Sequence, residues 1–266
     1  DIGIYEGGIW TVTGFQVQST GVANPPWTGG SGNWSSSGSW SDGGGAPAGA
    51  GAVAEFDNAT SPTVVTLDGP QTVGTLGFNS AQKFTLSGAA ITLDGNGYDS
   101  AINVTQGSHE IAAPINAVNG EVEIVISNNA SLKLSGKLTG LVSRVQLGLS
   151  STLDLTSNSM VVQYFGNDPY SEILAKVASA YDNGKWDGTG ITTSLATAPS
   201  NPGGIAIGVV DNAAAGWTAF ENQPVMASSV LIAPTWYGDA NMDGVVNSAD
   251  LALLSAGQAG GLTGWQ

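Results

Sequence analysis

Short segments in which apolar and polar residues alternate follow one another from residue 53 to about residue 162, separated by Gly, Asn, Asp and Ser. Each contains an apolar–polar–apolar triplet, and a period of two places alternate side chains on opposite faces of a β-strand. The triplets stand at residues 65–67, 84–86, 91–93, 102–104, 122–124, 132–134, 145–147 and 153–155. They predict a series of short strands, each with one buried face.

The spacing of these segments indicates stacked coils. Two or more strands recur at intervals of roughly 18–20 residues, and Gly closely follows several of them, which suits tight corners. We therefore predict an all-β fold, a parallel β-helix (β-solenoid), in which Asn and Thr at the corners stack into hydrogen-bonded ladders. A β-sandwich or jelly roll also contains many short strands and is the alternative fold.

The chain before these strands has a different composition. Residues 25–51 are rich in Gly and Ser and contain three indoles, Trp27, Trp34 and Trp40. We expect an ordered first coil in which the indoles pack on glycine backbone, while an exposed platform for stacking sugar rings is the alternative. Two further strands are expected at 10–12 and 15–17. The β-solenoid domain is accordingly expected to comprise residues 1–169.

A helix is predicted at residues 171–181. Its apolar residues, among them Ile173, Val177 and Tyr181, fall on one face. Because stacked coils expose an apolar end, we expect this helix to cover it. Residues 170–237 are expected to hold the capping helix and C-terminal strands.

Residues 239–250 carry the strongest motif of the chain. Oxygen-bearing side chains stand at loop positions 1, 3, 5, 9 and 12, with Gly at position 6 and an apolar residue at position 8. This spacing wraps the six to eight oxygen ligands of a hard cation around one point. The predicted calcium ligands are the side chains of Asp239, Asn241, Asp243, Asn247 and Asp250 and the backbone carbonyl of Val245. The alternative interpretation is an acidic turn that precedes a helix.

The calcium loop differs from a regulatory EF-hand, because position 12 is Asp250 rather than Glu and no clear helix precedes Asp239. It resembles a type I dockerin repeat. Residues 237–244, Tyr-Gly-Asp-Ala-Asn-Met-Asp-Gly, and the block at 182–194 resemble the tail of large secreted bacterial proteins that carry autotransporter-associated β-strand repeats and a dockerin-like segment. Thr-Leu-Ser-Gly at 85–88 is similar to their strand repeat.

This resemblance to dockerin-type surface proteins implies an exported β-solenoid at the bacterial cell surface or outside the cell, without catalysis. A dockerin carries two calcium loops, so residues 238–266 correspond to half of the usual pair. The helix that follows Asp250 then has an apolar stripe with no second helix to cover it.

Charge and composition exclude several functions. The chain has 266 residues, with 21 acidic against 6 basic side chains and a net charge of −15. Six scattered cations do not make a phosphate-neutralising surface, so we expect no nucleic-acid partner. The absence of Cys removes disulfides and thiolate chemistry. No run approaches the roughly 18 apolar residues of a transmembrane helix, so no membrane span is expected.

Catalytic candidates are few. His109 and Glu110 are neighbours, but adjacent residues on a strand point to opposite faces, so we expect His109 at the solvent or at a corner. A glycosidase needs two carboxylates about 5–9.5 Å apart. The candidates Asp94, Asp99 and Asp154 are also ordinary turn residues. Four cations stand in the strand region, too few for a lyase acting on acidic sugars: Lys83, Lys133, Lys137 and Arg144.

The sequence therefore predicts a non-catalytic extracellular structural protein, a calcium-stabilised β-solenoid subunit of a bacterial surface fibre, layer or matrix. Solenoid ends and edge strands carry unpaired backbone groups that few charges protect here, which favours self-assembly into a homo-oligomer or filament. A cell-surface adhesin or carbohydrate-binding module, with a carbohydrate partner, is the alternative. A polysaccharide-degrading β-helix enzyme is the third hypothesis.

Overall fold

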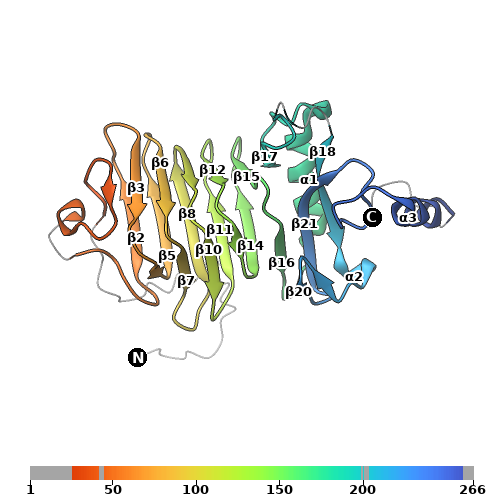
Figure 1. The fold of residues 1–266 in the computed structure, drawn as a ribbon, viewed down its shortest axis with the longest axis horizontal. Coiled ribbons are helices and arrows are strands. Elements are labelled where there is room, and N and C mark those ends of the chain that lie inside the picture. The colour runs from red at the N-terminus through yellow and green to blue at the C-terminus, as the bar shows by residue number, and fades with distance from the viewer. Residues whose placement is uncertain (1–25, 42–44, 199, 201–203, 260–266) are drawn as a thin grey trace, which may run out of the picture.

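The computed structural model describes residues 26–41, 45–198, 200 and 204–259, and these form a β-solenoid of about five turns. Its parallel strands stack along one long axis, as Figure 1 shows. The predicted parallel β-helix is confirmed, and the described chain has no sign of a jelly roll.

Three sheets form the walls of the solenoid. The seven-stranded sheet contains β1 (Gly32–Asn33), β3 (Thr63–Leu67), β6 (Phe84–Gly88), β9 (Ser108–Ile111), β12 (Ser131–Leu134), β15 (Thr152–Asp154) and β17 (Gly190–Thr192). The four-stranded sheet contains β4 (Gln71–Val73), β7 (Ile91–Asp94), β10 (Ile115–Val118) and β13 (Leu138–Thr139). The eight-stranded sheet contains β2 (Val53–Asp57), β5 (Thr75–Asn79), β8 (Ser100–Gln106), β11 (Val122–Ile126), β14 (Val142–Leu147), β16 (Met160–Gln163), β18 (Ile205–Asp211) and β21 (Ser229–Trp236).

One turn of the solenoid is longer than the sequence spacing predicted. Val65, Leu86, Ile111 and Leu134 are successive register partners in the seven-stranded sheet, so a turn takes about 21–25 residues. Most turns contain three short strands, one from each sheet.

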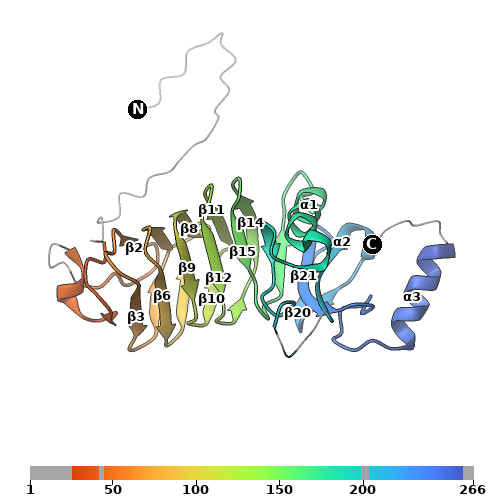
Figure 2. The same cartoon turned by 90° about the horizontal axis from the view of Figure 1, so that it is seen from above.

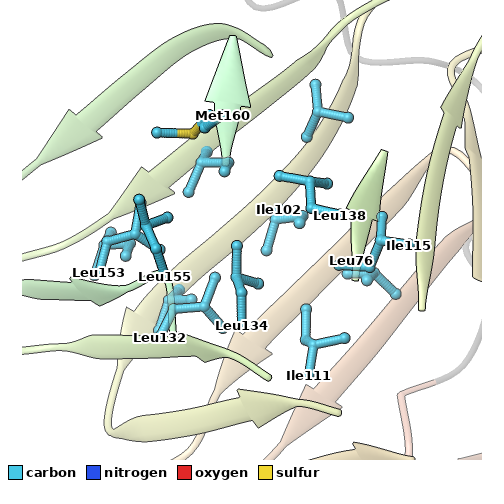
Figure 3. Packing of buried hydrophobic residues seen from close by; sticks show 14 of the residues in the cluster. Leu76, Ile102, Ile111, Ile115, Leu132, Leu134, Leu138, Leu153, Leu155 and Met160 are labelled. Carbon is cyan, nitrogen blue, oxygen red and sulfur yellow. The ribbon is translucent and has the colours of Figure 1, made fainter. Parts of the chain in front are cut away.

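The interior of the solenoid is filled by apolar side chains, some from the predicted triplets, such as Ile102 and Leu134, and others from strands outside them. Leu76 and Ile102 enter from the eight-stranded sheet, Ile111 and Leu134 from the seven-stranded sheet, and Ile115 from the four-stranded sheet (Figure 3). All five side chains are fully buried. Along each strand, alternate side chains therefore face the interior and the solvent, as the alternating sequence pattern predicted.

Polar residues connect successive turns on the outside. Thr105 Oγ1 donates to Asn79 Oδ1 at 2.9 Å, and Thr139 Oγ1 donates to Asn116 Oδ1 at 2.7 Å. These pairs join β8 to β5 and β13 to β10, as expected for Asn and Thr ladders. At several corners Asn adopts a left-handed backbone, for example Asn129 with φ 60°.

An aromatic cluster fills the N-terminal end of the described solenoid. Trp27, Trp34 and Trp40 are buried and lie with Phe56 in one group, in which the rings of Trp34 and Trp40 are 5.1 Å apart and tilted by 66°. The predicted burial of these indoles is confirmed, but they pack on one another and on Phe56. An exposed platform for sugar rings is wrong for these three residues. A short 3-10 helix, η1 (Ser37–Ser39), belongs to this segment. The strands expected at 10–12 and 15–17 lie outside the described residues.

The C-terminal end has a different construction. Helix α1 (Tyr170–Tyr181), the helix expected at 171–181, packs against β17 and β18 at this end and is followed by η3 (Asp182–Gly184). Strand β21 pairs antiparallel with both β16 and β18, so the parallel stacking ends there. The same end contains α2 (Asn212–Ala215) and the hairpin of β19 (Ala219–Phe220) and β20 (Gln223–Pro224).

Helix α3 (Ser248–Ala259) projects from the C-terminal end, as Figure 2 shows. Leu251 is 62% exposed, and Leu253 and Leu254 are each 49% exposed. The apolar side chains of this helix thus have no cover within the described residues. Among those residues, no helix has the length and hydropathy needed to cross a membrane.

Candidate functional site

The predicted calcium loop leaves the solenoid directly after strand β21. Gly238 turns the chain with φ 94°, and Asp239, the first predicted ligand, is buried at the base of the loop. Thr235 Oγ1 on β21 donates to Asp239 Oδ2. The first position of the loop is therefore held by a strand of the solenoid wall. The sequence motif did not include Thr235, because it lies on a strand four residues before the loop.

Asp250 closes the loop at its other end. Its Oδ1 accepts from the backbone N–H of Ala240 at 2.8 Å and of Asn241 at 3.2 Å, and its Oδ2 accepts from the N–H of Asn247 at 2.7 Å. Asp250 is buried at the start of α3. Hydrogen bonds from Asn247 and then from Asn241 and Ala240 hold the pKa of this carboxyl below its ordinary value. The first and last predicted ligands are thus brought into one closed ring.

The tight turn inside the loop is built by Asp239 as well. Its Oδ1 accepts from the N–H of Asp243 at 3.2 Å, and its Oδ2 accepts from the N–H of Gly244 at 2.8 Å. Gly244 has φ 87°, a conformation that glycine adopts without a steric penalty. The glycine at position 6 therefore has the role that the motif predicted.

The remaining polar residues of the loop bond to one another. The N–H of Asp243 donates to Asn241 Oδ1 at 3.1 Å, and the N–H of Val245 donates to Asp243 Oδ1 at 2.9 Å. Asn247 Nδ2 donates to the carbonyl of Val245 at 3.4 Å. The six predicted ligands therefore belong to one compact hydrogen-bonded loop.

The donor set of this loop fits a hard cation. It consists of three carboxylates, two amide side chains and one backbone carbonyl, all of which are oxygen ligands of the kind that Ca²⁺ takes. Within the described residues no three Asp, Glu, Cys or His side chains form a metal cluster by themselves. Calcium binding here would therefore depend on Asn241, Asn247 and the Val245 carbonyl as well as on the carboxylates.

His109, the only histidine of the chain, was expected at the solvent or at a corner, and this prediction is wrong. His109 is 2% exposed and lies inside the solenoid, stacked on Phe78 with ring centroids 5.0 Å apart. Nδ1 accepts from the N–H of Phe84 at 3.0 Å, and Nε2 lies 2.8 Å from the Gln106 carbonyl oxygen. Burial lowers its pKa, so the neutral ring serves as a core residue.

Two of the carboxylate candidates, Asp94 and Asp154, lie on different walls of the solenoid. Asp94 is on β7 in the four-stranded sheet, whereas Asp154 is on β15 in the seven-stranded sheet. Asp94 accepts from the N–H of Asn96, and Asp154 accepts from the N–H of Thr156, both at 2.9 Å. These two carboxylates act as turn residues on different walls.

Most of the cations of the strand region are paired with acids. Lys83 Nζ lies 2.6 Å from Glu110 Oε2, Lys133 Nζ lies 3.8 Å from Asp154 Oδ2, and Arg144 pairs with Glu123. The Lys133 and Arg144 pairs each join neighbouring strands of one sheet, and Lys83 stands one residue before β6, the neighbour of the strand that carries Glu110. These cations therefore serve the wall of the solenoid and are not collected into a site for acidic sugars.

Comparison with known proteins assigns no family to this chain. No protein-family model matches it, and no curated protein or solved structure matches it either. Its function is therefore argued from the residues and their arrangement.

Proposed function

We propose that this chain is a non-catalytic structural protein of the bacterial cell surface or extracellular space, a calcium-stabilised β-solenoid that assembles into a fibre, layer or matrix. The observation that carries the proposal is the uncovered helix α3 at the end of an elongated stack of coils. Fully burying one leucine side chain contributes about 1.5–3 kcal/mol, so Leu251, Leu253 and Leu254 favour a contact with a second surface.

The geometry of the solenoid also favours assembly of identical chains. The two ends of the described stack differ, with an aromatic cluster at one end and α1, β18 and β21 at the other. A head-to-tail contact between unlike ends does not close on itself unless its rotation permits a ring, so it generates filaments. The resemblance to dockerin-type surface proteins and the small share of charged residues, 10%, support an extracellular or cell-surface location.

Assembly is tested by light scattering of the full chain in calcium. We expect particles larger than one chain, and replacing both Leu251 and Leu254 with Ser should shift the population toward the monomer. Leu149→Ser is the matched control, because Leu149 is also exposed but lies on the solenoid body. Removing residues 1–20 tests the opposite end of the chain and should also reduce assembly. A full chain that stays monomeric in calcium contradicts the proposal.

Calcium is assigned a structural role in this proposal. The cation would be held by Asp239, Asn241, Asp243, Asn247, Asp250 and the Val245 carbonyl, and it would neutralise three carboxylates confined to one short loop. A ligand that binds only the folded state stabilises it by mass action, by about 2.7 kcal/mol at a concentration one hundred times the Kd.

Removal of calcium is expected to loosen the chain after Gly238. Excess chelator should lower the melting temperature or speed proteolytic cleavage beyond this residue, and Asp243→Ala should reproduce the effect in calcium. Asp187→Ala is the control, since Asp187 is an exposed acid outside the loop. If melting and tail proteolysis are the same with and without chelator, calcium has no structural role here.

A further inference from the structure

A polar cleft of about 690 Å³ crosses the outer face of the eight-stranded sheet, over β2, β5, β8, β11 and β14. Its lining includes Glu55, Asp57, Asn79, Asn103 and Gln146. Neighbouring strands are about 4.8 Å apart, so five strands give the cleft a length of roughly 19 Å at right angles to the chain direction. A linear molecule could lie in it across successive turns.

Register places the polar side chains of the cleft in rows. Glu55 on β2 pairs with Gly77 on β5, which pairs with Asn103 on β8, and the same row continues through Val125 to Gln146. All five residues belong to the outward set of their strands, because inward positions such as Phe56 and Ile102 alternate with them. The row thus offers a hydrogen-bonding group on three of five strands.

Glycine at position 77 gives the Glu55 side chain its room. A Cβ atom added to Gly77 would lie 2.0 Å from Glu55 Oε2 and 2.4 Å from its Cδ. The carboxyl of Glu55 therefore lies directly over the neighbouring strand, within the cleft. Any larger residue at position 77 would displace it.

One carboxylate oxygen at this end of the cleft lacks a hydrogen-bond partner within the described part of the chain, although the Asp57 carboxyl also bonds to the Asn79 side chain. Asp57 Oδ1 is buried and has no hydrogen-bond partner among the described residues. Burial, and then the charge of Asp57, raise the pKa of Glu55 to about 7. By contrast, Glu110, Glu123 and Asp154 on the outer faces are paired with cations. A carboxyl that destabilises the fold when ionised marks a candidate functional position.

We propose that this cleft binds a neutral glycan strand laid across the turns of the solenoid. Sugar hydroxyls both donate and accept hydrogen bonds, so they match the mixed lining of Asp57, Asn79, Asn103 and Gln146. The row of Glu55, Asn103 and Gln146 would offer such hydroxyls one carboxyl and two amides across the turns. This function is independent of the assembly of the chain.

The charges of the cleft select against other polymers. The lining contains three acids, Glu55, Asp57 and Glu123, and one cation, Arg144. Because acids outnumber cations, the cleft repels an acidic polysaccharide. The face of a sheet also offers no unpaired backbone groups, which an extended peptide would need for strand addition. A neutral polysaccharide, rich in hydroxyl groups, is the class of polymer that remains.

Binding is tested with the full chain and four soluble neutral polysaccharides, a β-glucan, a xylan, a galactomannan and a xyloglucan, by affinity electrophoresis and calorimetry. Polygalacturonate serves as the acidic probe. We expect at least one neutral polymer to bind, and Asn103→Ala to weaken that binding about tenfold, equivalent to about 1.4 kcal/mol. Asn116→Ala is the matched control, because Asn116 is an outward amide on β10 of the four-stranded sheet.

Glu55→Gln separates a binding role from a structural one. The charged groups around the Glu55 carboxyl are Asp57 on the same strand and Glu123 and Arg144 across the cleft. The neighbouring strand, with Gly77 and Asn79, and the segment of Trp27 that pairs with β2 add no charge. Because the folded pKa of Glu55 lies above its ordinary value of 4.5, stability is lost as pH rises through about 7. Glu55→Gln should therefore melt higher than the natural chain at pH 8, with a smaller difference near pH 4, and bind the glycan more weakly.

The proposal is overturned if none of the four neutral polymers binds or if polygalacturonate binds as tightly as they do. It is also overturned if Asn103→Ala and Glu55→Gln bind as the natural chain does. Light scattering of the same samples reports on assembly separately, so the failure of one proposal leaves the other standing.

Discussion

Replacing Phe56 with Ala is expected to lower the free energy of unfolding by about 3–5 kcal/mol, the range for losing a buried aromatic side chain. Phe56 is fully buried, and its ring centroid lies 5.1 Å from that of Phe78, 5.4 Å from Phe84, 5.8 Å from Trp34 and 5.9 Å from Trp40. These neighbours come from strands of two sheets and from the first coil, so they cannot all move in to fill the cavity. Denaturant unfolding followed by tryptophan fluorescence measures the loss.

Phe165→Ala is the matched control for this prediction. Phe165 is 81% exposed, so removing its ring should change stability by less than about 0.5 kcal/mol. Equal effects of the two substitutions would mean that the aromatic cluster does not hold the first coil on the solenoid.

Asn158→Ala is expected to cost about 2–4 kcal/mol, because it leaves several buried groups without partners. Asn158 Nδ2 donates to the carbonyls of Leu134 at 2.8 Å and of Gly136 and Leu155 at 3.0 Å, and Oδ1 accepts from the N–H of Leu138 at 2.8 Å. One side chain thus joins two successive turns. Thermal and denaturant unfolding measure the effect.

Asn128→Ala tests whether any outer amide has the same importance. Asn128 Oδ1 accepts from the N–H of Leu149 at 2.8 Å, but this bond is exposed to water. We expect a loss below about 1 kcal/mol, since water replaces the missing acceptor. A loss as large as that of Asn158→Ala would contradict the importance given to burial.

The strands were predictable because one local rule, alternation, decides which face of each is buried. The triplets at 65–67, 91–93 and 132–134 all lie in the strands expected of them. The length of a turn was underestimated because pairs such as Leu86 and Ile111 are set by register between distant strands, and loop lengths differ from turn to turn.

His109 is a position where the alternation was predicted correctly but the wrong residue of the pair was placed outside. Its neighbour Glu110 faces outward and pairs with Lys83, so the two do point to opposite faces as argued. Ile111 shares the face of His109 and is buried. The apolar Ile111, two residues after His109, therefore indicated that His109 faces the interior. The prediction followed the polarity of the imidazole instead.

The two candidate sites differed in how far the sequence could reveal them. All six predicted ligands of the calcium loop lie within twelve consecutive residues, so their spacing alone was enough to predict them. The residues of the cleft, such as Glu55, Asn103 and Gln146, stand on separate turns and meet only through parallel register. No motif connects them along the chain.

The parallel stacking also determines how disorder can spread through the molecule. A turn in the middle, such as the one containing β9, touches mainly the turns before and after it, so stability is close to a sum of nearest-neighbour contacts. In such a linear array opening starts at a terminal unit and advances one unit at a time. The aromatic cluster and the antiparallel strand β21 stand at these two starting points, and they therefore act as barriers to fraying for every turn between them.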